Sequence, residues 1–141
     1  MTKSKLGTLV FAALTAACFM GSVHADEQTD RTLAAGKQRF MQNCAACHGE
    51  NAKGAGIVAT HLETVPADLT QLSKNNNGSF PFKSIYDTID GRTDIGAHGS
   101  RDMPVWGAEY KLGTPTAGGM SESVVRGRIL ELIVYLQSIQ E

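Results

Sequence analysis

Two cysteines and a histidine form a tight cluster in the first half of the chain. Cys44 and Cys47 lie three positions apart, and His48 follows the second cysteine directly. A Cys-x-x-Cys-His run is typical of covalent haem attachment, because the two thiols are spaced to reach the two vinyl groups on one porphyrin edge and the imidazole then meets the iron. The run therefore predicts one covalent haem c, with thioether links at Cys44 and Cys47 and His48 as the proximal iron ligand.

Two other chemistries use the same cysteine spacing. A redox disulfide of the thioredoxin type is expected within a βαβ pattern, and no such pattern surrounds the run. A zinc site needs further ligands, whereas the sequence has three cysteines in all and no second Cys-x-x-Cys pair. Both chemistries stay as alternatives to haem attachment, and an absorption spectrum separates them from it.

Residues 1–25 predict an export signal. Two lysines give a basic start, residues 6–20 form a mostly apolar core, and residues 23–25 are a small-residue cleavage site. The apolar run is shorter than a typical membrane span, and no second such run follows it. We therefore expect a cleaved signal peptide, a periplasmic location, no membrane span, and a mature domain at 26–141.

Cys18 allows a second interpretation of this segment. A lipoprotein signal also ends at a cysteine after small residues, but the position three before Cys18 is Thr15 rather than the usual Leu or Val. A lipid anchor at Cys18 is therefore the less favoured alternative. After cleavage behind Ala25, Cys44 and Cys47 are the remaining cysteines, and haem attachment uses both.

Length and charge restrict the function classes. The mature chain has 116 residues, enough for one small domain, and holds 11 basic against 14 acidic side chains, a net charge of about −3. A mildly acidic chain disfavours nucleic acid and anionic lipid as partners.

Apolar residues spaced by three and four predict an all-α fold. The expected helical segments are about 29–47, 79–91, 121–141 and a short turn at 68–72. Gly49 and Gly91 should end the first two helices, and Ser79 should cap the second, with Pro81 in its first turn. These helices make a thin core, so we expect short helices and Gly-rich loops to wrap around the haem.

The second axial ligand decides what the iron can do. The candidates with sulfur or nitrogen donors are Met41, Met103, Met120, His61 and His98. Met103 is favoured, because Pro104 fixes the backbone directly after it and keeps it out of helical geometry. Ligation by His61 or His98 instead would lower the potential, and an open distal position is the remaining alternative.

With these features the chain resembles a class I (mitochondrial-type) cytochrome c of the bacterial periplasm, over the whole mature length. The resemblance rests on the run Cys44 to His48, the Met103-Pro104 loop and the two terminal helices. In that family, a small residue and an aromatic on the first helix cross a Leu and an aromatic on the last. The matching residues in this chain are Gly36, Phe40, Leu132 and Tyr135.

The chain also departs from the family pattern. Family members commonly carry Gly-Pro after the attachment loop, and a backbone carbonyl there holds the second nitrogen of the proximal imidazole. This chain has Gly56 and Ile57 there, so the carbonyl of Ile57 or of Pro66 is expected to take that role. Trp106 resembles family aromatics near a haem propionate, and Arg101 is a candidate ion-pair partner of a propionate.

The resemblance implies a monomeric periplasmic electron carrier with His48 and Met103 as axial ligands and no catalytic residue. Its partners would be a redox donor and a redox acceptor that dock transiently. One alternative is a dedicated cytochrome c subunit of a periplasmic dehydrogenase or oxidase, which would have a stable partner. A less favoured alternative is a haem enzyme or gas sensor, whose open distal site would bind carbon monoxide readily.

Overall fold

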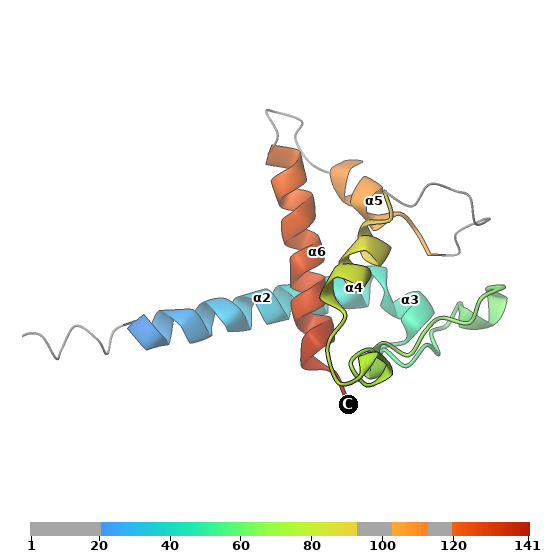
Figure 1. Cartoon of the computed structure of the whole chain (residues 1–141). Helices are drawn as coiled ribbons and strands as arrows, with labels where there is room; N and C mark the ends of the chain where they lie inside the picture. Colours follow the sequence, from blue (N-terminus) through green and yellow to red (C-terminus); the bar gives the residue numbers. More distant parts are fainter. Residues whose placement is uncertain (1–20, 93–102, 113–119) are drawn as a thin grey trace, which may run out of the picture. The chain divides into compact units, whose positions relative to one another are not determined.

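A computed structural model of the chain describes residues 21–92, 103–112 and 120–141. The chain divides into two units, residues 1–31 and residues 32–141. Within the described ranges the regular structure is helical and contains no strand (Figure 1). The all-α prediction is therefore confirmed.

The α-helices are α2 (Gly21–Asn43), α3 (Ala45–His48), α4 (Phe82–Asp90), α5 (Trp106–Leu112) and α6 (Met120–Ser138). Three short 3-10 helices lie between α3 and α4, namely η1 (Ala59–His61), η2 (Leu69–Gln71) and η3 (Lys74–Asn76). None of the helices in the described ranges combines the length and the apolar composition that crossing a bilayer requires.

Some sequence predictions fall outside the described residues. They concern the apolar core of the export signal, Cys18, His98 and Arg101. The backbone of Met120 begins α6, but its side chain is not described. Cleavage behind Ala25 and the fate of Cys18 stay predictions.

The first unit contains the start of α2. The helix runs without a break from Gly21, and an ion pair one turn apart joins Arg31 to Glu27. We predicted a start near residue 29, so the observed helix begins about two turns earlier. Residues 22–28 contain neither Pro nor Gly, and nothing in their backbone chemistry stops the helix.

The predicted helix over 29–47 is in fact two helices. The longer one, α2, ends at Asn43, and the single turn of α3 begins at Ala45 after Cys44, whose φ is −117°. Gly49 follows α3 as predicted, with a φ of 80°. The break at Cys44 lets the chain turn at the attachment motif itself.

The second predicted helix is shorter at its start. Ser79 is not its cap, because α4 begins at Phe82 and the carbonyl of Pro81 accepts the first helical hydrogen bond, from the Ile85 N–H at 3.0 Å. Gly91 ends α4 in the left-handed region with a φ of 64°, as predicted.

The other two predicted segments are confirmed, and one helix was missed. A turn at 68–72 is present as η2, where the Asp68 carboxylate accepts a hydrogen bond from the Thr70 N–H at 2.9 Å. The last helix is α6. The missed helix is α5, which has seven residues and too few apolar repeats to give a periodic signal.

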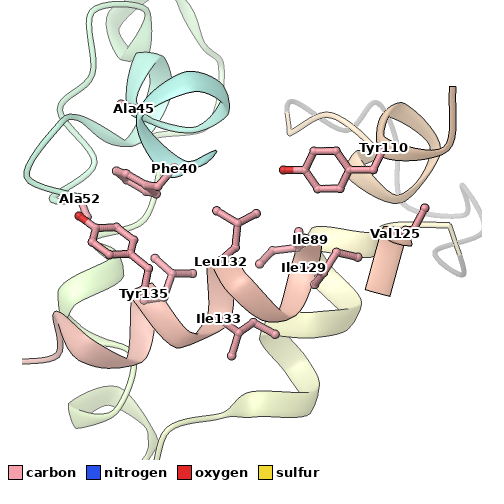
Figure 2. Close-up of a cluster of buried hydrophobic side chains, with 11 residues drawn as sticks. Phe40, Ala45, Ala52, Ile89, Tyr110, Val125, Ile129, Leu132, Ile133 and Tyr135 are labelled. Atoms are coloured by element: carbon pink, nitrogen blue, oxygen red, sulfur yellow. The ribbon is translucent and has the colours of Figure 1, made fainter. Parts of the chain in front are cut away.

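The hydrophobic core is arranged around α6. Both α4 and α5 pack on α6 and on each other. Figure 2 shows Leu132 pointing to the side of α6 where Phe40 and Tyr110 lie, whereas Ile133 points to the opposite side. The buried apolar residues are Phe40, Ala45, Ala52, Ile89, Tyr110, Val125, Ile129, Leu132, Ile133, Tyr135 and Leu136.

The crossing of α2 and α6 depends on a residue without a side chain. A Cβ atom at Gly36 would lie 2.0 Å from the carbonyl oxygen of Glu131 and 2.9 Å from the Cβ of Tyr135. One turn further along α2, the Phe40 ring lies 5.3 Å from the Tyr135 ring, centroid to centroid. The predicted close crossing at Gly36 is confirmed, and it places the end of α2, and with it the cysteine motif, against the core.

Candidate functional site

The attachment motif is built on one tight turn. The carbonyl of Cys44 accepts hydrogen bonds from the Cys47 N–H at 3.1 Å and from the His48 N–H at 2.9 Å. This turn presents the side chains of Cys44, Cys47 and His48 to the same cavity. A loop then wraps closely around the turn, and a Cβ at Gly56 would lie only 2.2 Å from the carbonyl oxygen of Ala46.

The two thiols are half-buried and form no disulfide. Burial, followed by the proximity of Cys47, raises the pKa of the Cys44 thiol to about 12. A redox-active Cys-x-x-Cys pair needs the opposite, a thiol whose pKa is lowered toward neutrality. The surroundings of Cys44 therefore disfavour the redox-disulfide alternative and keep the thiol neutral.

The ring of His48 is oriented by a backbone carbonyl. Its Nδ1 lies 3.0 Å from the carbonyl oxygen of Ala67. A carbonyl only accepts, so Nδ1 donates its proton to Ala67, and in the neutral ring this tautomer has its lone pair at Nε2, where a metal can bind. The prediction that Ile57 or Pro66 supplies this carbonyl was wrong: the partner is Ala67, one residue after Pro66.

The reason for this difference lies in the loop. Ile57 is 85% exposed, on the part of the loop that follows the contact of Gly56 with the attachment turn. The chain then continues through η1 and returns to the imidazole at residues 66–67. The family pattern predicted that a carbonyl partner exists, but the path of the chain between His48 and Ala67 decides which residue provides it.

The cavity beside the motif has a volume of about 1190 Å³. Its walls are mainly apolar, and they come from α2, η2, α4 and α6 as well as from the motif. The main apolar lining residues are Phe40, Leu69, Ile85, Ile89, Leu132 and Leu136. Such a wall suits a large, flat and apolar group.

Met103 lines this same cavity, together with Pro104 and Trp106. The Met103 side chain is half-buried and packs against the hydrophobic core. The structure thus brings the favoured second-ligand candidate to the cavity that the cysteine motif lines.

The other described candidates lie elsewhere. The side chain of Met41 is 39% exposed, and His61 is exposed at the end of η1; neither lines the cavity. His98 and the side chain of Met120 lie outside the described residues. Met103 is therefore the candidate that the geometry favours among those that can be compared.

The donor set fits a covalently attached haem. Two thiols, one imidazole whose Nδ1 is engaged by a carbonyl and one thioether line an apolar cavity, which matches the attachment and ligation chemistry of haem c. A zinc centre fits poorly, because no group of three or more His, Cys, Asp or Glu side chains lies close enough to hold a metal within the described ranges.

The contacts that α5 makes through Tyr110 were not predicted from the sequence. Tyr110 is buried, its ring lies 5.7 Å from that of Trp106, and the guanidinium groups of Arg39 and Arg128 lie 5.5 Å and 5.8 Å from its centroid. The Asn43 amide also donates a hydrogen bond to the Tyr110 hydroxyl at 3.2 Å. The spacing of four between the two aromatics was the one local signal for this helix.

Comparison with known proteins identifies a family. The family model described as cytochrome C oxidase, cbb3-type, subunit III matches residues 31–116, which include the attachment motif and Met103. No curated protein and no solved structure matches the chain.

Proposed function

This chain belongs to the family of c-type cytochromes whose model describes subunit III of cbb3-type cytochrome c oxidase, and on that premise we propose that it is a periplasmic carrier of single electrons. Membership of the family implies a covalently bound haem c and a role in electron transfer. The number of haems, the ligand pair, the location and the partners are part of the proposal.

One observation carries the proposal: Cys44, Cys47, His48 and Met103 line a single apolar cavity. We assign Cys44 and Cys47 as the thioether positions of one haem. We assign His48 as the proximal ligand through Nε2, since Nδ1 is engaged by the Ala67 carbonyl. Met103 is assigned as the distal ligand.

When bound, the haem supplies a one-electron ferric–ferrous couple. The protein side of the mechanism is mainly positioning. His48 and Met103 would both hold the iron, and with both bound the protein would offer no vacant iron site to a substrate or to dioxygen. Pro104 stiffens the backbone after Met103, and the apolar walls exclude water from the cavity, so little has to rearrange when the charge changes.

Absorption spectra in both redox states test the proposal. Protein purified from cells that mature c-type cytochromes should give a pyridine haemochrome spectrum of one thioether-linked haem per chain. The ferric form should show the iron–thioether charge-transfer band, and Met103→Ala should remove it. If the band persists in that variant, another residue is the distal ligand; colourless protein from such cells contradicts the haem assignment itself.

The location and the partners need separate measurements. The predicted signal at 1–25 supports export to the periplasm, and the mature chain should begin at Asp26 with an unmodified N-terminus. Intact mass measures both, because a lipid at Cys18 would add the mass of its acyl chains and retain residues 18–25. A monomer that exchanges electrons through brief encounters should elute alone in gel filtration.

A stable subunit of an oxidase is the second candidate function. The description of the matching family model, which names a subunit of cytochrome c oxidase, favours it. Purification of a tagged chain from its own cells, at a low detergent concentration, distinguishes the oxidase subunit from the free carrier. Recovery of a haem-containing oxidase in equal amount supports the subunit role, and recovery of the chain alone supports the free carrier.

A further inference from the structure

A network of charged side chains joins α4, α5 and α6 on the side of Met103. Arg92 pairs with Asp90 at the end of α4, and its Nη1 donates to both carboxylate oxygens of Glu122 in α6 at 2.8 Å and 2.9 Å. Lys111 of α5 pairs with the same Glu122 carboxylate at 3.1 Å. We call Asp90, Arg92, Lys111 and Glu122 the Arg92 network.

The Asp90 and Arg92 part of the network is largely shielded from solvent. The side chain of Asp90 is 12% exposed and that of Arg92 is 26% exposed. A carboxylate so far from water is stable there when a cation pairs with it, and the planar guanidinium of Arg92 reaches two carboxylates at once. Loss of Arg92 or of one of its partners therefore leaves an uncompensated charge at this junction.

α5 lies directly on the network. A Cβ at Gly107 would lie 1.7 Å from Oδ1 of Asp90 and 2.5 Å from Nε of Arg92. Lys111 anchors the other end of α5 to Glu122, and Arg128 of α6 donates a hydrogen bond to the Tyr110 carbonyl at 2.9 Å. The position of α5 is thus set by ion pairs and by a contact that tolerates no side chain at Gly107.

Met103 is tied closely to α5. The Val105 carbonyl accepts hydrogen bonds from the N–H groups of Ala108 and Glu109 at 3.0 Å and 3.1 Å, and the Pro104 carbonyl accepts one from Trp106 at 3.1 Å. The backbone between Met103 and α5 is therefore short, hydrogen-bonded and stiffened by a proline. A shift of α5 moves Met103 with it.

We propose that the Arg92 network positions the Met103 thioether for the iron by fixing α5 on α6 and α4. The proposal rests on the proposed function, in which Met103 is the distal ligand. Arg92 and Glu122 act as positioning residues, because they work through α5. Weakening the network increases the fraction of molecules in which Met103 is off the iron, and an added ligand binds in proportion to that fraction.

Two carboxylates of α6 provide a matched test. Glu122 is 34% exposed and pairs with Arg92, while Glu131 is 31% exposed and pairs with Arg39 of α2 at 2.7 Å. We expect Glu122→Gln to let imidazole bind the ferric protein about tenfold more tightly and to weaken the iron–thioether band. Glu131→Gln breaks a similar ion pair at the crossing of α2 and α6 and keeps every contact of the Arg92 network, so it should change both far less although its thermal stability falls.

Two glycines provide an independent pair. Gly107→Ala places a methyl group against Asp90 and Arg92, whereas an added Cβ at Gly127 of α6 meets nothing within 4 Å. Imidazole should bind Gly107→Ala at least about tenfold more tightly than Gly127→Ala. If Gly107→Ala does not accumulate as folded protein, the Glu122→Gln comparison still decides.

The outcomes separate this proposal from the one on which it rests. Met103→Leu gives the reference for a protein without the distal thioether. If wild type already binds imidazole as tightly as Met103→Leu, Met103 is not the ligand, and both proposals are overturned. If Met103→Leu loses the band but Glu122→Gln and Glu131→Gln bind imidazole equally, the ligation stands and the positioning role is overturned.

Discussion

The two walls of the cavity are held in place in different ways. On the attachment side, the structure from Cys44 to Ala67 is held by hydrogen bonds to backbone carbonyls within one stretch of chain. Examples are the Gly56 N–H to the Cys47 carbonyl at 3.0 Å and the His48 ring to the Ala67 carbonyl. On the Met103 side, α5 is held by side chains that come from other elements, among them Arg92 and Glu122, which are 30 positions apart.

This difference predicts that the two sides of the cavity differ in stability. The attachment side can form as a local unit, because its partners are neighbours in sequence. The Met103 side exists only when α4, α5 and α6 are assembled, so its stability depends on the tertiary structure. In the proposed ligand pair, His48 should thus be the firmly held ligand and Met103 the one that conditions can loosen.

The largest expected effect comes from removing an attachment thiol. Cys47→Ala leaves Cys44 as the one attachment thiol, and we expect the amount of covalently bound haem to fall about tenfold or more, because the haem then has at most one thioether link and otherwise depends on ligation and packing. Mass spectrometry of the purified chain and a pyridine haemochrome assay measure it. Ser123→Ala, on the exposed face of α6, is the control and should keep the full haem content. Full covalent loading of Cys47→Ala would contradict the assignment.

Changing Met103, the proposed distal ligand, should leave attachment intact and alter the midpoint potential. We expect Met103→His to retain its haem and to lower the midpoint potential by on the order of 0.2 V, within the roughly 0.8 V range that axial ligands cover. Redox titration followed by absorbance measures the shift. A potential equal to that of wild type would mean that residue 103 does not touch the iron.

A methyl group on the attachment loop tests how rigid that side is. A Cβ at Gly56 would lie within 2.6 Å of the backbone of Ala46 and Cys47, which cannot move aside as a side chain can. We expect Gly56→Ala to lower the free energy of unfolding of the holoprotein by about 3 kcal/mol, measured by denaturant titration. Gly127→Ala, with open space around it, should instead raise it by up to about 1 kcal/mol.

The smallest expected effect is a pH dependence on the Met103 side. Hydrogen bonds from Arg92 and then from Lys111 lower the pKa of Glu122 below its ordinary 4.5. A lowered folded-state pKa contributes stability above pH 4.5 that is lost as the pH falls through the folded value. The difference in thermal midpoint between wild type and Glu122→Gln should therefore be constant from pH 6 to 5 and shrink below pH 4.5. A difference that grows on acidification would contradict the ion pair.

The sequence predicted the local features well. The spacing of the cysteine motif, the end of α4 at Gly91 and the turn at Asp68 all depend on neighbouring residues, and the structure bears out the last two. Local features of this kind are set by backbone conformation and by helical periodicity, so residue types and their spacing are enough to predict them. The close crossing at Gly36 is also borne out, but it was expected from the family resemblance and not from a local pattern.

The features that the sequence did not predict depend on the path of the chain. The carbonyl of Ala67 was missed because a loop of nearly twenty residues separates it from His48. Helix α5 and its partners were missed because Arg92, Lys111 and Glu122 look like ordinary surface charges until three helices meet. No periodic pattern encodes a contact of that kind.

The crossing at Gly36 has a consequence for how much the chain can vary. It joins positions 36 and 131. Most of the residues that line the cavity lie in the segment between these two positions, which are held together at the crossing. The entropy of closing a loop rises only logarithmically, by about 0.6 kcal/mol for each doubling of its length. Insertions in an exposed turn such as 77–79 should therefore be inexpensive, which allows new docking features to be added while the helix crossing stays as it is.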